Sequence, residues 1–95
     1  MNATAEMQIP TQCPEATELH KRIDSIIDMI PADFENKEGV IRQLVDRRGS
    51  IPYTAPKMID VRWNEVGAIL SNNLPDPESE SWAKDIAMFF SKPLG

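Results

Sequence analysis

The sequence has few of the residues on which catalysis and metal binding usually depend. Its 95 residues include one cysteine, one histidine and four glycines. The single cysteine, Cys13, cannot form an intramolecular disulfide, so folding has no need of an oxidising compartment. The sequence contains no glycine-rich phosphate loop, no zinc-ligand spacing and no EF-hand loop. We therefore expect no metal, no cofactor and no enzymatic activity.

The two most reactive side chains lack the partners that chemistry would require. His20 would need a second ligand or an acid at suitable spacing, and Asp24, four residues further on, could hydrogen-bond it. Cys13 precedes an expected helix start at Pro14, where the helix dipole favours a thiolate. Nucleophilic catalysis would also need a base and an oxyanion site. We interpret His20 as a surface or boundary residue and Cys13 as an accessible thiol.

Long apolar runs are also missing. Every apolar run in the sequence is far shorter than the roughly 20 residues of a membrane-spanning helix, so we expect no membrane span. The N-terminal residues have neither a basic start nor an apolar stretch, which argues against a secretory signal. Hydrophobic residues at 41% and charged residues at 26% are typical of a globular protein. A cytoplasmic location is the expectation.

The spacing of the apolar residues predicts an all-α fold. The clearest helix covers residues 14–30 and has a proline near each end. Its apolar residues recur every three or four positions, which places them in one stripe along a helix. They are Ala16, Leu19, Ile23, Ile26 and Ile30, with Ile27 widening the stripe.

Three further helices are expected, over residues 36–48, 55–71 and 77–91. Gly49 is placed for a left-handed cap at the end of the first of these, with Ile51 packing back. Thr54 can cap the second, and Asp76 followed by a proline can cap the third. No segment has the period of two that a strand requires.

Together these elements predict a compact four-helix domain over residues 13–95. Residues 1–12 have no apolar period and are expected to form a flexible arm.

The net charge of −5 is unevenly distributed. Residues 1–36 carry −5 and residues 63–95 carry −3, whereas residues 37–62 carry +3. Either these charges balance one another within a compact bundle, or the basic segment is an electrostatic footprint for an acidic partner. DNA binding by the second and third helices is less favoured, because their connection is long for a helix-turn-helix and the third helix is nearly neutral.

Apolar and aromatic residues are plentiful near the C-terminus. The segment from Ala87 to Phe90 is apolar on too many sides for a lone amphipathic helix. Such side chains either complete the core of the monomer or face a partner, where aromatic residues and methionine are favoured. The candidate interface residues are Ile23, Ile27, Ile30, Phe34, Trp82, Ile86, Met88, Phe89 and Phe90.

The leading hypothesis is a small acidic regulatory protein of a bacterial type that binds and inhibits or sequesters another protein. Two functional classes have this size and charge, namely anti-activators of transcription regulators such as quorum-sensing receptors, and phage inhibitors of host systems. An apolar helix face would compete for a surface of the target, with acidic residues aiding encounter. The alternatives are a DNA-binding transcription regulator and an accessory subunit of a larger enzyme complex. The sequence does not identify the target.

The sequence also predicts a homodimer, because a narrow isoleucine stripe and surplus aromatic residues can form a seam with a second copy. Sedimentation at micromolar concentration should give twice the mass of one chain. Sedimentation as a monomer under those conditions would contradict the prediction.

Overall fold

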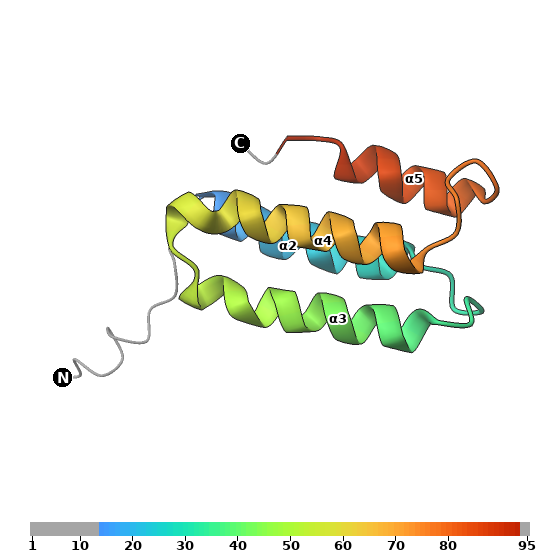
Figure 1. Ribbon diagram of the computed structural model, residues 1–95, viewed down its shortest axis with the longest axis horizontal. Coiled ribbons are helices and arrows are strands. Elements are labelled where there is room, and N and C mark those ends of the chain that lie inside the picture. The colour runs from blue at the N-terminus through green and yellow to red at the C-terminus, as the bar shows by residue number, and fades with distance from the viewer. Residues whose placement is uncertain (1–13, 94–95) are drawn as a thin grey trace.

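The computed structural model describes residues 14–93, which form helices joined by short connections (Figure 1). The α-helices are α2 (Pro14–Met29), α3 (Lys37–Ser50), α4 (Ile59–Asn73) and α5 (Ser81–Phe90). Two 3-10 helices, η1 (Ile51–Tyr53) and η2 (Pro56–Met58), connect α3 to α4. Residues 14–93 contain no strand, so the predicted all-α fold with four helices is confirmed. The expected flexible arm, residues 1–12, lies outside the described residues.

Helix α2 is the element on which the others assemble. It packs against α3, α4 and α5, and α3 and α4 also pack against each other. Helix α5 lies on the opposite side of the bundle from α3 and contacts mainly α2 (Figure 1). The result is a three-helix bundle with a fourth, shorter helix laid along one side.

The predicted apolar stripe of α2 supplies the centre of the core. Leu19, Ile23, Ile26 and Ile30 are all buried, at no more than 1% exposure. Burying one such side chain contributes roughly 1.5–3 kcal/mol, so the stripe is a major part of the folding free energy. Its partners on the other elements are Val40, Leu44, Ile51, Ile59, Trp63, Val66, Ile69, Leu70 and Ile86. The stripe therefore faces the chain's own helices.

The fourth helix begins later than predicted, at Ser81. The expected start at residue 77 is wrong because Asp76 caps a turn. The backbone N–H of Glu78 donates to Asp76 Oδ1 at 2.9 Å, and that of Ser79 donates to the Asp76 carbonyl at 2.8 Å. Because the oxygens of Asp76 accept hydrogen bonds within the turn, Asp76 does not cap the helix. The helix starts only after Glu80, which has an extended backbone.

The connection between α3 and α4 also differs from prediction. Helix α3 continues through Gly49 to Ser50, and no residue in the described range has a positive φ, so the predicted left-handed cap is wrong. Ile51 is buried, as its predicted packing requires. The predicted N-cap at Thr54 is wrong, because the N-cap of α4 is Met58; the Thr54 hydroxyl donates instead to the Ser50 carbonyl at 2.7 Å. Prolines in η1 and η2 favour short 3-10 turns here, because they lack the N–H of a continuous helix.

The central position of the α2 stripe generates a stability prediction. Ile26→Ala should lower the free energy of unfolding by about 2–5 kcal/mol, because it leaves a cavity that the surrounding helices cannot close. Met88→Ala, at a side chain that is 60% exposed, should change it by no more than about 0.5 kcal/mol. Urea denaturation followed by circular dichroism measures both, and equal effects would contradict the assignment of the core.

Candidate functional site

A groove with a volume of about 460 Å³ lies between α4 and α5. Its inner surface includes the buried residues Leu70, Ala83 and Ile86, which also belong to the interior of the bundle. Its rim includes exposed residues on both helices, Ser71 on α4 and Ala87 on α5. The apolar lining residues that remain partly exposed are Leu74, Pro75 and Phe90.

Phe90 forms the wall at one end of the groove. Its ring stacks on that of Trp63, with centroids 4.2 Å apart and 29° between the planes. A Cβ atom at Gly67 would lie 2.5 Å from Phe90 Cζ, well inside contact distance. The missing side chain at Gly67 is therefore what allows the Phe90 ring to lie across α4.

Arg22 fastens the end of α5 to α2. Its side chain is only 9% exposed, and its Nε donates to Glu18 Oε2 at 2.8 Å. Its Nη2 donates to the Pro93 carbonyl at 2.6 Å, and its Nη1 donates to the Lys92 carbonyl. A buried guanidinium is tolerated only when its charge and its N–H groups have partners. These partners couple the position of the chain after α5 to the middle of α2.

The same guanidinium also lies over two aromatic rings. Arg22 Cζ is 5.5 Å from the ring centroid of Trp63 and 5.8 Å from that of Phe89, both within cation–π range. The indole of Trp63 therefore contacts both Arg22, which binds the end of α5, and Phe90, which lines the groove.

The predicted interface residues of α2 are placed mainly inside the fold. Ile23 and Ile30 are core residues, so they present no surface to a partner, and Ile27 is half-buried against the core. Ile86 is buried as well, but it lines the groove. The α2 stripe, which the homodimer prediction places at a seam with a second copy, packs here within the monomer.

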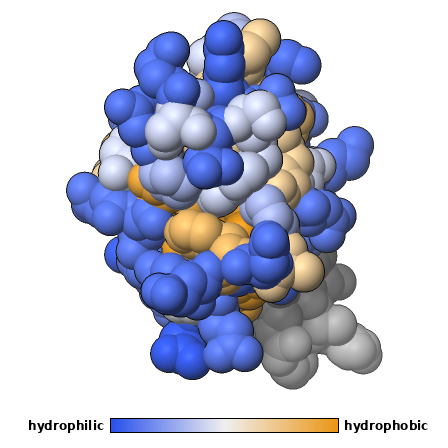
Figure 2. Space-filling view, turned by 90° about the vertical axis from the view of Figure 1, so that its right-hand side faces the viewer, coloured by the Kyte–Doolittle hydropathy of each residue, from blue (hydrophilic) through white to orange (hydrophobic). Residues whose placement is uncertain are grey.

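The predicted aromatic residues are distributed over three places. Phe34 and Trp82 meet edge to face, with centroids 5.1 Å apart, where the α2–α3 connection meets the start of α5. Figure 2 views this end of the molecule and shows a small hydrophobic area surrounded by hydrophilic residues. Phe90 lines the groove, Phe89 lies beside Arg22, and Met88 points to solvent.

Sequence reasoning did not find the α4 side of the groove. The helical spacing marks Leu70 as an inward residue, but it does not show that α5 leaves this position accessible. Gly67 was also missed, although a glycine within an apolar helix is a signal of close approach by another group.

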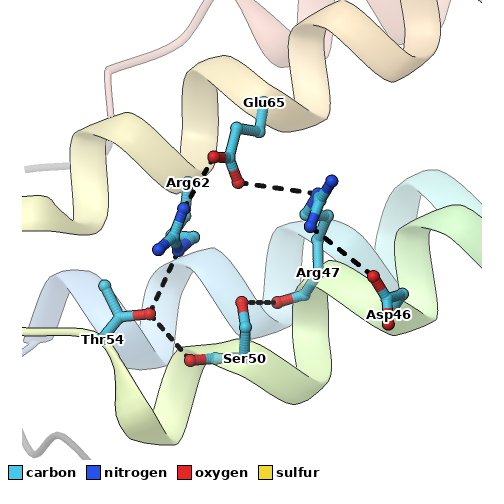
Figure 3. Close-up of polar contacts among 6 residues, drawn as sticks. All are labelled: Asp46, Arg47, Ser50, Thr54, Arg62 and Glu65. Carbon is cyan, nitrogen blue, oxygen red and sulfur yellow. Dashed lines mark hydrogen bonds and ion pairs between the residues drawn. The ribbon is translucent and has the colours of Figure 1, made fainter.

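Arginines of the basic segment are paired within the chain (Figure 3). Arg62 Nη1 donates to Glu65 Oε2 at 2.7 Å, and the other oxygen of Glu65 lies 3.6 Å from Arg47 Nε. Arg47 also lies 3.6 Å from Asp46. On the other side of α3, Arg48 forms an ion pair with Asp24 of α2. The contacts of Arg47 with Glu65 and of Arg48 with Asp24 join α3 to α4 and to α2.

The same close-up shows how the α3–α4 connection joins this network (Figure 3). Ser50 Oγ donates to the Arg47 carbonyl at 2.7 Å, and Arg62 Nε donates to Thr54 Oγ1 at 3.3 Å. Outside the network, Lys37 Nζ donates to the Ile30 carbonyl at 2.7 Å. Three of the six basic residues between positions 37 and 62, Arg47, Arg48 and Arg62, thus pair with acidic side chains of the chain itself, so part of the charge of this segment is balanced internally.

His20 has the partner that its spacing suggested. Its Nδ1 lies 3.4 Å from Asp24 Oδ2, and its side chain is 52% exposed. Within residues 14–93, no three histidine, cysteine, aspartate or glutamate side chains are grouped so that they could hold a metal ion. Cys13 lies outside the described residues.

Comparisons of the chain with protein-family models, with curated proteins and with solved structures found no match. None of the helices between residues 14 and 93 is long and apolar enough to cross a membrane.

The close approach at Gly67 generates a prediction about the groove. In Gly67→Ala, the new methyl group should force the Phe90 ring off Trp63, and the NMR signals of both rings should shift. The gain of up to about 1 kcal/mol from helix propensity should be largely offset by the lost stacking.

Gly49→Ala is the matched control, because nothing lies within 4 Å of a Cβ atom at that position of α3. It should stabilise the protein by about 1 kcal/mol and leave the Phe90 signals in place. Unchanged Phe90 and Trp63 signals in Gly67→Ala would show that the ring does not lie across α4.

Proposed function

We propose that this protein is a regulator that binds another protein in the groove between α4 and α5 and thereby inhibits or sequesters it. The observation that carries the proposal is the groove itself, which lies over the buried residues Leu70, Ala83 and Ile86. The apolar lining that stays partly exposed is Leu74, Pro75 and Phe90. Apolar surface that a fold leaves accessible in a concave place is a frequent mark of a binding site.

The physical basis is the release of water from this apolar lining. Each square ångström of apolar surface removed from water contributes roughly 25 cal/mol, and a concave site can cover most of an inserted side chain. The lining of the groove combines such apolar residues with a few polar ones, including Asn64 and Ser71 on α4. Polar groups at a rim restrict orientation, whereas the apolar lining supplies most of the affinity.

The proposed mode of action is competition. A partner segment held in the groove is withdrawn from its own dimer or ligand surface, as expected of an anti-activator of a bacterial transcription regulator or a phage inhibitor of a host system. The acidic net charge of −5 would speed encounter with a basic target. A cytoplasmic site of action belongs to the same proposal. We do not propose DNA binding, because Arg47, Arg48 and Arg62 are already paired with acidic side chains.

The proposal is tested with two neighbouring substitutions on α5. Ala87 is exposed and lines the groove, so Ala87→Arg should fill the groove without disturbing the core. Met88 is exposed and does not line the groove, so Met88→Arg is the matched control. Extracts of the producing cell are passed over each tagged variant, and retained proteins are identified by mass spectrometry.

A protein retained by the unsubstituted chain and by Met88→Arg should be lost from Ala87→Arg, whose helical circular dichroism should be unchanged. Adding the unsubstituted chain should then lower the activity of the purified target, and Ala87→Arg should not. Equal retention by all three proteins would place the binding surface elsewhere.

A further inference from the structure

We infer that the segment held in the groove is a basic amphipathic helix of the partner, with an apolar face and lysine or arginine near its ends. This inference rests on the proposed function, because it concerns the occupant of the same groove. Three properties of the groove lead to it, namely the kind of backbone that forms its walls, its length, and the charge around it.

The walls of the groove favour a helix as the occupant. Both long walls are α-helices, α4 and α5, whose backbone N–H and C=O groups are bonded within each helix except at the ends. They offer no free edge to which an extended strand could add. An incoming segment must therefore satisfy its own backbone hydrogen bonds, and a helix does so.

The length of the groove fits the side-chain spacing of a helix. On α4 its lining residues run from Asn64 to Ser71, a rise of about 10 Å at 1.5 Å per residue. Apolar residues at positions i, i+3 or i+4, and i+7 of a helix span about 10 Å. Two turns of an incoming helix can therefore place three side chains over the inner residues of the groove.

The charges around the groove favour a basic occupant. Asp76 lines it, and Glu78 and Glu80 are exposed in the same connection. Residues 74–85 carry four acidic side chains and one basic one, Lys84, for a net charge of −3. Beyond the Phe90 wall, Asp60 is exposed in the same helical row of α4 as Asn64, Gly67 and Ser71. Acidic residues therefore stand beyond both ends of the apolar lining.

A second copy of this chain is a poorer occupant on the same grounds. Each copy carries a net charge of −5, so the acidic connections of one copy would meet an acidic molecule. The longest apolar stripe, that of α2, is already buried within the monomer.

The test uses synthetic helical peptides of about fifteen residues as probes. The first has leucines along one face and lysines at both ends, the second has glutamates in place of the lysines, and the third has serines in place of the leucines. Fluorescence anisotropy at low salt measures affinity for the full chain, and NMR shift changes identify the residues that each peptide contacts. The lysine peptide should bind about tenfold more tightly than the glutamate peptide, and the serine peptide should not bind measurably.

Variants of the protein separate groove binding from general attraction between opposite charges. Ala87→Arg should abolish binding of the lysine peptide, and NMR shifts should be confined to α4, α5 and their connection. Combining Asp76→Asn with Glu80→Gln should reduce the preference for lysine to about threefold or less. The charge-matched control, Glu15→Gln with Asp46→Asn, removes two exposed acids outside the groove and should keep the full preference. Salt should weaken the preference but not the contribution of the leucines.

Equal binding of the lysine and glutamate peptides, or binding of the lysine peptide that survives Ala87→Arg, would overturn the inference. A dimer of this chain that Ala87→Arg dissociates would also overturn it, because a second copy would then occupy the groove. These outcomes are distinct from failure of the proposed function. If Ala87→Arg still prevents capture of a cellular target, the groove binds proteins and only the basic character of the helix is wrong.

Discussion

Burial of the isoleucine stripe of α2 is the constraint on which the rest of the structure depends. Ile23, Ile26 and Ile30 can leave water only if helices cover them from several sides, and α3, α4 and α5 each pack on α2. Arg22 stands on the same helix, and its bonds to the carbonyls of Lys92 and Pro93 bring the end of α5 to α2. One helix therefore organises both the core and the placement of the fourth helix.

The groove is a consequence of how α5 is attached. Its end is held by Arg22 and by the Phe90 ring, which lies across α4 only because Gly67 has no side chain. Helix α5 packs mainly on α2, so it does not fully cover the α4 surface around Leu70. The residues that complete the fold and those that shape the candidate site are thus partly the same, which couples the stability of α5 to the shape of the groove.

Some charged side chains pair within the bundle, whereas others are exposed to solvent. Arg47 and Arg48 of α3 pair with Glu65 of α4 and Asp24 of α2 and so join neighbouring helices, while Arg62 pairs with Glu65 within α4. Their positive charge is neutralised by acidic side chains within the bundle. Acidic residues of the α4–α5 connection have a different position, because several of them are exposed beside the groove. The uneven charge distribution along the chain therefore places exposed acidic side chains around the apolar groove.

The sequence by itself determined the helical class, the number of α-helices and the inward face of α2, because these follow from residue spacing and proline position. It did not determine the start of α5, because Asp76 accepts hydrogen bonds within a turn and the helix begins only at Ser81. Ile86 and Phe90 were predicted as contact residues, but the α4 side of the groove was not. Only the tertiary structure decided that groove, because its shape depends on contacts between residues far apart in the sequence. Gly67 meets Phe90, and Arg22 binds the carbonyls of Lys92 and Pro93, and no local pattern links these residues.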